Sequence, residues 1–314
     1  MNRGHEFIGR AYSEEEKEHL REIRETWVKE SARPYNGELE KTEEELHMVR
    51  FADELVRKEL ESLGVTDYVS VDPSNVHILL ADVFEREFPN SRNSAIHQST
   101  SSNIVLNGGV SKPLLFRLMV HELVHWASTR KFYFDKEDES YLDARTGYRI
   151  RSSWKEPVER QALVGFNEIM VEQTTIKILR KNQSLLQENV NITPDELDGP
   201  IYSYMEYAPL LSDIAKGITA YKNTSMAQVF TDLELGQFQK HILALKDIEG
   251  AFGKGSLKVL SCLGVPRDDN SRREIDEAVI KYFSTTDPNQ RAEMQPSLLL
   301  RFNEMRKKSS FTPE

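Results

Sequence analysis

Two histidines and a glutamate stand at a spacing that suits metal-assisted hydrolysis. The segment Val120–Trp126 contains the pattern H-E-x-x-H, with His121 and His125 four residues apart and Glu122 directly after the first histidine. On a helix, residues at positions i and i+4 share one face, so both imidazoles can bind one Zn²⁺. The Glu122 carboxylate can then accept a proton from a water molecule that the metal activates. The pattern alone is only moderately specific, because two histidines satisfied within a packed core have the same spacing.

A second segment supplies carboxylates that such a site needs. Glu168 and Glu172 are also four residues apart, on a stretch from about residue 160 to 180 that is strongly apolar, as in a buried helix. A carboxylate on a buried helix needs a partner, and a metal ion or a metal-binding histidine is an efficient one. We expect one carboxylate to bind the metal and the other to accept the N–H of a ligand imidazole.

The two motifs together resemble a known family. H-E-x-x-H followed on a later helix by the N-E-x-x-x-E of Asn167, Glu168 and Glu172 is similar to the gluzincins, the thermolysin-like clan of zinc metallopeptidases. The resemblance extends over about residues 95–180. Glu172 stands where the family usually has Asp, and the spacing between the second histidine and Glu168 is longer than in thermolysin, which bears on the ligand assignment.

The resemblance implies a role for each residue of the two motifs. His121, His125 and Glu168 would bind Zn²⁺, and Glu122 would be the general base of peptide hydrolysis. Glu172 would accept a hydrogen bond from a ligand histidine, with His121 as the expected donor. Asn167 matches the Asn that precedes the ligand glutamate in thermolysin-like enzymes.

Other zinc-ligand arrangements fit the chain less well. A metzincin needs a Gly and a third His further along the same helix, where this chain has Ser128 and Lys131. Four other glutamates between the two motifs lie in segments without clear periodicity and are better interpreted as solvated charges: Glu137, Glu139, Glu156 and Glu159.

The other side of the catalytic cleft is less well defined by the sequence. The resemblance implies a Tyr or His that stabilises the oxyanion, and Tyr148 is our first candidate because it lies between His125 and Glu168. A packing role for Tyr148 in the core is an equally good interpretation. Three weaker candidates come from the C-terminal helices: Tyr202, Tyr204 and His241.

The strand before the metal helix is the expected peptide-binding edge. In zincins an extended peptide pairs with an edge strand of the sheet, and residues 103–107 are placed to be that strand. His97, on a β-favouring run just before it, is a further candidate for the cleft, although a lone strand histidine is more often a surface or packed residue.

The pattern of elements predicts an α+β fold. Short β-favouring runs occur near residues 76–80, 95–97 and 103–107, and helices are predicted from Thr42 to about Leu63 and from about Lys112 to Arg130. After residue 182 only helices are predicted. We therefore expect a zincin-like domain with a small mixed sheet and an active-site helix at 65–182, an N-terminal helical region at 1–64 and a C-terminal helical subdomain at 183–314.

Composition narrows the function classes. The net charge of −10 argues against binding to nucleic acid or anionic membranes, and no apolar run approaches the length of a membrane span. The N-terminus lacks the apolar core of a signal peptide, so we predict a cytoplasmic protein, with nonclassical export left open. Cys262 is the only cysteine, which excludes an intrachain disulfide. The expected partner is a peptide or protein substrate, and the oligomeric state is not predicted.

Two other functions compete with the zinc peptidase. One is a noncatalytic module that keeps zinc for structure or for binding a peptide or protein, although a structural site does not need Glu122. The other is a purely helical interaction module, which would account for the C-terminal half but not for the two motifs.

Overall fold

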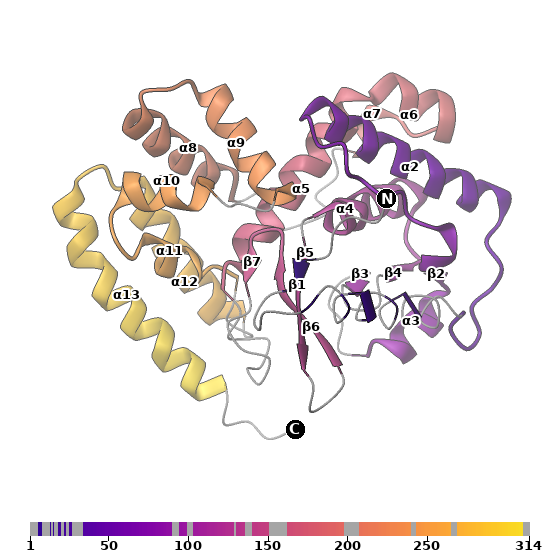
Figure 1. Ribbon diagram of the computed structural model, residues 1–314, viewed down its shortest axis with the longest axis horizontal. Coiled ribbons are helices and arrows are strands. Elements are labelled where there is room, and N and C mark those ends of the chain that lie inside the picture. Colours follow the sequence, from indigo (N-terminus) through magenta and orange to yellow (C-terminus); the bar gives the residue numbers. More distant parts are fainter. Residues whose placement is uncertain are drawn as a thin grey trace. The chain divides into compact units, whose positions relative to one another are not determined.

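The chain is an α+β protein that is mostly helical, as predicted. The computed structural model describes residues 34–89, 94–98, 103–128, 130–135, 140–150, 162–197, 207–239, 243–264 and 269–309, with residues 6–7 and scattered positions between 13 and 26. Helices dominate these ranges, and the strands form small sheets (Figure 1). In the part of the chain that the structure describes, no helix has both the length and the apolar character needed to cross a membrane.

The chain divides into two compact units. The first comprises residues 1–143 and 171–201, and the second comprises residues 144–170 and 202–314. The boundaries near residues 64 and 182 that the sequence suggests stay a prediction about separately folding regions.

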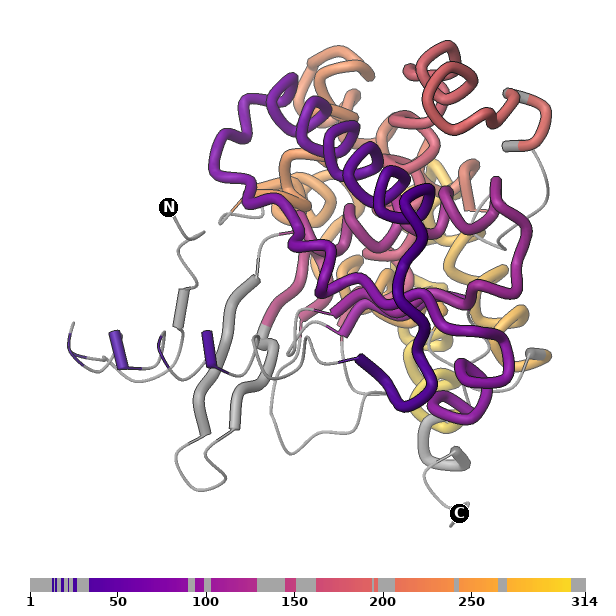
Figure 2. The backbone as a smooth tube through the Cα atoms, turned by 90° about the vertical axis from the view of Figure 1, so that its right-hand side faces the viewer, coloured from indigo at the N-terminus to yellow at the C-terminus, as the bar shows by residue number. Residues whose placement is uncertain are grey.

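Helix α2 (Glu43–Ser62) begins and ends where its sequence predicts. The Thr42 side chain accepts from the Glu45 backbone N–H, and the Glu45 carboxylate accepts from the Thr42 backbone N–H, which completes a capping box. Gly64 follows the helix at a φ of 77°, a left-handed conformation that favours glycine. Figure 2 shows α2 as the long helix in indigo and purple. Its buried apolar face contributes to the core of the first unit.

A mixed three-stranded sheet belongs to the first unit. Its strands are β2 (Val76–Leu79), β3 (Ala95–Gln98) and β4 (Asn103–Asn107), in the order β2-β4-β3. Strand β4 pairs with β2 in parallel and with β3 in antiparallel orientation. The prediction that residues 103–107 form the edge strand is therefore wrong, because β4 has a strand on both sides. Its buried run Asn103–Leu106 agrees with a central position.

Helix α4 (Lys112–Ala127) carries the H-E-x-x-H motif and is buried along most of its length. Pro113 lies in its first turn, where the missing N–H costs no hydrogen bond. The helix packs against α2 and against strands β3 and β4. Every residue from Leu115 to His125 is buried, so polar side chains in this stretch need partners inside the protein.

The chain after α4 forms strands that the sequence did not predict fully. Strands β5 (Arg130–Asp135) and β6 (Ser140–Thr146) follow α4, and the short β7 (Arg149–Ile150) pairs antiparallel with β6. Strand β1 (Glu6–Phe7) pairs in parallel with β5, which gives the order β1-β5-β6-β7. Charged residues interrupt the apolar alternation of β5 and β6, which explains why the sequence pattern did not predict these two strands.

Helix α5 (Val164–Lys181) is the second helix of the metal motif, and only helices follow it among the described residues. This agrees with the prediction for the chain after residue 182. Two short helical elements lie directly before and after β2 in the chain. The remaining helical elements are η1 (Pro73–Asn75), α3 (Ala81–Glu87), α6 (Gln183–Val190), α7 (Pro194–Leu197), α8 (Ala208–Lys222), α9 (Met226–Phe238), α10 (Leu243–Phe252), α11 (Ser256–Leu260), α12 (Asp269–Ser284) and α13 (Pro288–Ser309).

The second unit has a large apolar core of its own. Side chains from helices α8 to α13 form most of it, together with Tyr148, Leu163 and Phe166. The lone Cys262 is buried in this core as a free thiol. Gly165, at the beginning of α5, approaches the Leu263 carbonyl so closely that an added Cβ would lie 2.5 Å from that oxygen.

Candidate metal centre

Helix α4 places the two histidines of the motif on one face. His121 and His125 are four residues apart, and their ring centroids are separated by 5.0 Å. Both residues are buried, each with 8% of its surface exposed. The imidazoles are therefore held inside the protein in the arrangement that the i, i+4 spacing predicts.

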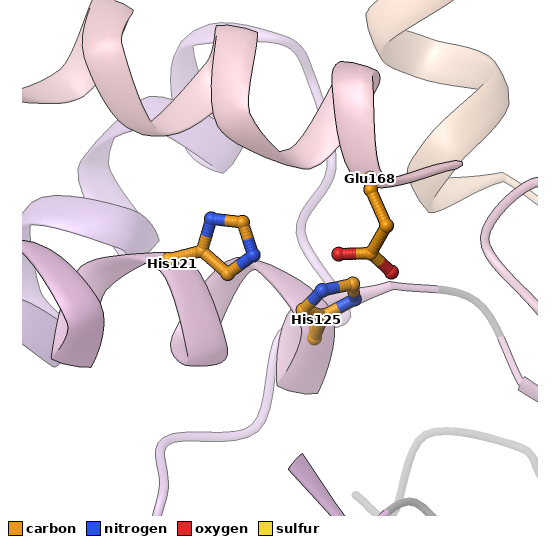
Figure 3. A group of neighbouring side chains, drawn as sticks. All are labelled: His121, His125 and Glu168. Atoms are coloured by element: carbon orange, nitrogen blue, oxygen red, sulfur yellow. The ribbon is translucent and has the colours of Figure 1, made fainter. Parts of the chain in front are cut away.

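Glu168 of α5 completes a group that can hold a metal ion. One ligand atom each from His121, His125 and Glu168 lies within 4.8 Å of the other two. Figure 3 shows the two imidazoles and the Glu168 carboxylate turned toward one another, from α4 and α5. Among the described residues no other group of His, Cys, Asp and Glu side chains meets this criterion. The set of two imidazoles and one carboxylate is a ligand set that Zn²⁺ accepts.

Glu172, one turn after Glu168 on α5, contacts the first histidine. The His121 Nδ1 atom lies 3.0 Å from Glu172 Oε2, and both side chains are buried. An ionised carboxylate can only accept, so the hydrogen lies on Nδ1 and the imidazole keeps Nε2 as its ligand atom. This is the contact that the resemblance implied for Glu172.

Arg117 is a member of this cluster that sequence reasoning missed. Its Nη2 donates to Glu172 Oε1, and only 5% of the residue is exposed. Burial alone would raise the pKa of Glu172, but the hydrogen bond with His121 and the Arg117 charge outweigh burial and hold the pKa below its usual range. The signal was present in the sequence as a positive charge within an apolar stretch, one turn before His121.

His97 lies beside the second histidine. The His97 and His125 rings are nearly parallel, at 10°, with centroids 6.0 Å apart. His97 belongs to β3, which is an edge of the three-stranded sheet. The structure thus places His97 beside a candidate ligand, and its approach to a substrate cleft stays a prediction.

Glu122 occupies the position next to the histidine pair. It is buried on α4, with 6% of its surface exposed, and it is not one of the three clustered ligands. Its assignment as the general base stays a prediction from the motif.

Tyr148 is a core residue. It is fully buried, its hydroxyl donates to the Leu233 carbonyl at 2.7 Å, and its ring contacts Phe166 edge-on. The absence of a side chain at Gly236 makes room for the hydroxyl, because a Cβ there would collide with it. Burial raises the pKa of Tyr148. Of the two interpretations that the sequence left open, this geometry supports packing, and the phenol is not a candidate for oxyanion stabilisation.

Asn167 fixes the turn that leads into β7. Its Oδ1 accepts from the Tyr148 backbone N–H at 2.9 Å and from Gln237 Nε2 at 3.2 Å. The residue is buried. Its observed role is thus to connect the start of α5 with the 147–148 turn and with α9.

Several residues considered from the sequence lie outside the described part of the chain. They are the alternative acidic ligands Glu137, Glu139, Glu156 and Glu159 and the cleft candidates Tyr202, Tyr204 and His241.

Comparisons with protein-family models, with curated proteins and with solved structures find no match for this chain.

Proposed function

We propose that this protein is a zinc-dependent peptidase of the gluzincin type. The observation that carries the proposal is the cluster of His121, His125 and Glu168, whose ligand atoms lie within 4.8 Å of one another. This cluster joins two sequence motifs that are distant in the chain, and a chance H-E-x-x-H pattern would have no reason to meet a third ligand.

The residues around the cluster support zinc binding. The contact between His121 Nδ1 and Glu172 is the carboxylate–histidine arrangement that orients a ligand imidazole toward a metal. His121, His125 and Glu168 would hold the metal, and a set of three protein ligands is typical of catalytic zinc sites. Structural zinc sites usually have four protein ligands.

Glu122 supplies the proton transfers of the proposed reaction. Bound Zn²⁺ would polarise the peptide carbonyl and make a water molecule acidic near neutral pH. Glu122 would accept a proton from the attacking water and would deliver it to the leaving nitrogen. The carboxylate is restored at the end of the cycle.

Strand β3 is the edge at which we place an extended peptide substrate. It pairs with β4 on one side, packs against α4 and carries His97 beside His125. A peptide that adds a strand to β3 would bind through main-chain hydrogen bonds, so recognition would depend little on its sequence.

Cleavage of a diverse peptide library, followed by mass spectrometry, tests the proposed activity. We expect the zinc-loaded wild type to cleave peptides and Glu122→Gln to lose activity by about 10²–10⁴-fold while it retains zinc, because it lacks the base. The matched control is Glu188→Gln, on the exposed surface of α6, which should cleave like the wild type.

The same experiment separates the noncatalytic alternative. A wild type that binds zinc and peptides but leaves the whole library intact would contradict the peptidase and favour a zinc-containing binding module. Equal cleavage by wild type and Glu122→Gln would contradict the assigned base.

A further inference from the structure

We propose that Arg117 is a positioning residue of the metal centre, which acts through Glu172 to fix the nitrogen that His121 presents to a metal. This inference rests on the proposed function, because fixing a nitrogen of His121 matters only if a metal binds there. Its geometry, however, stands on contacts within the first compact unit.

Arg117 extends the ladder of α4 by one turn. Arg117, His121 and His125 follow one another at intervals of four residues on the same helix, so their side chains share a face. The stretch from Leu115 to His125 is buried, and a guanidinium in such a place needs an anionic partner. The carboxylate of Glu172 is such a partner.

The Glu172 carboxylate uses its two oxygens for two different residues. Oε1 accepts from Arg117, and Oε2 accepts from His121 Nδ1 at 3.0 Å. The guanidinium is charged at every relevant pH and has a planar arrangement of donors, so it fixes the orientation of the carboxylate as well as balancing its charge. A carboxylate held at both oxygens cannot rotate away from the imidazole.

This arrangement has a consequence for His121. Because Glu172 keeps the hydrogen on Nδ1, the lone pair is on Nε2, which is directed away from Glu172 and is the nitrogen that could bind a metal. Without Arg117, Glu172 would be a buried carboxylate with a single neutral partner, which is an unfavourable state. The His121 ring would then lose the partner that selects its tautomer.

A double-mutant cycle tests whether Arg117 acts through Glu172. The variants are Arg117→Met, Glu172→Gln and the double variant, and the readout is the zinc dissociation constant from chelator competition. We expect Glu172→Gln to weaken zinc binding by about 10–100-fold, the range for loss of an outer partner of a ligand histidine. Arg117→Met should weaken binding by a similar factor, and the double variant should be no more than about two-fold weaker than Glu172→Gln alone.

A second readout needs no metal. Nitrogen-15 NMR of the metal-free protein reports the tautomer of His121, which we expect to be the Nδ1–H form in the wild type and a mixture in Arg117→Met. Arg117→Lys keeps a positive charge and should restore the Nδ1–H form and most of the zinc affinity. The matched control is Arg145→Met: Arg145 is similarly buried but donates to backbone carbonyls, including that of Gly236. It should lower thermal stability without changing the tautomer.

The outcomes separate this inference from the proposed function. A wild type that does not bind zinc contradicts the proposed function, while the tautomer measurement still decides the role of Arg117. If Arg117→Met does not fold, Arg117→Gln takes its place in both measurements, because it removes the charge but keeps a polar side chain. Additive losses of zinc affinity, or an unchanged His121 tautomer in the folded Arg117 variant, would overturn the inference.

Discussion

At the scale of single residues, metal binding at the candidate site would depend on which nitrogen of each imidazole carries the lone pair. An imidazole has two nitrogens, and the partner of one decides which remains for a metal. His121 has Glu172 as that partner, and Glu172 in turn has Arg117. The chemistry of the site thus extends beyond the three candidate ligands to a buried pair of opposite charges.

Local spacing explains which of these residues the sequence could predict. His121 with His125, and Glu168 with Glu172, are pairs at i and i+4, and helical geometry alone places each pair on one face. The contact of Arg117 with Glu172 joins residues that are 55 positions apart on two helices, so no local pattern could reveal it. Tyr148 lies between His125 and Glu168 in the sequence, where the resemblance implies a catalytic residue. Its hydroxyl is hydrogen-bonded to Leu233 of α9, and this contact between distant segments cannot be predicted from local sequence.

Replacing Tyr148 by Phe tests the packing role. Loss of the hydrogen bond to the Leu233 carbonyl should lower the free energy of unfolding by about 1–2 kcal/mol, because a buried acceptor loses its donor. The activity of the folded protein should change by less than about two-fold, whereas loss of an oxyanion donor would lower kcat by about 10²–10³-fold.

Tyr282→Phe is the matched control for this prediction. Tyr282 is also buried, and its hydroxyl donates to a backbone carbonyl, that of Phe252, at 3.3 Å. Both variants should behave alike in urea unfolding and in peptide cleavage. A selective loss of kcat in Tyr148→Phe would return the phenol to the catalytic machinery.

At the scale of elements, the sequence predicted which segments form helices and strands better than it predicted the order of the strands within the sheet. The β2, β3 and β4 runs were all visible as β-favouring stretches, but the central position of β4 depends on pairing partners rather than on its own residues. Helices α2, α4 and α5 were predicted because their apolar periodicity is long. The position of α5 also depends on its contacts with α2.

A buried acid attaches α5 to α2. Glu59 of α2 is 3% exposed, and its carboxylate lies 2.8 Å from Lys181 Nζ and 3.0 Å from Lys177 Nζ, both of α5. Burial alone would raise the pKa of Glu59, but the two lysines outweigh it and hold the pKa below its usual range. Folding therefore favours the ionised form of this carboxyl group.

The sign of this pKa shift gives a pH prediction. The contribution of Glu59 should be complete above its unfolded pKa of about 4.3 and should be lost as the pH falls through the lower folded-state value. Glu59→Gln should lower the free energy of unfolding at pH 7 by about 1–3 kcal/mol, with the lower part of the range favoured because both lysines are partly exposed. It should also make the acid limb of the stability curve shallower.

Glu61→Gln on the same helix is the control. Glu61 pairs with Arg57 at 2.9 Å, with both side chains about half exposed, and such pairs contribute about 0.3–0.5 kcal/mol. Urea unfolding between pH 3 and pH 7 measures all three proteins. Identical acid limbs for wild type and Glu59→Gln would contradict the attachment of α5 through this ionised group.

At the scale of the whole molecule, the α+β class followed from the switch between short β-favouring runs and long amphipathic helices. The division into two compact units did not follow, because the second unit takes residues 144–170 from the middle of the chain. No composition change marks that segment, and only its contacts with the C-terminal helices assign it. The metal helix α4 and the polar cluster of Arg117, His121 and Glu172 lie wholly in the first unit.

The zinc content of the purified protein after dialysis against a weak chelator tests the central claim most directly. We predict a single bound Zn²⁺ per chain in the wild type and in the exposed control Glu188→Ala. Glu168→Ala should retain its fold by circular dichroism but lose the metal, because only two ligand residues remain. A wild type without zinc, or a Glu168→Ala variant that holds zinc as tightly as the wild type, would contradict the metal centre described for His121, His125 and Glu168.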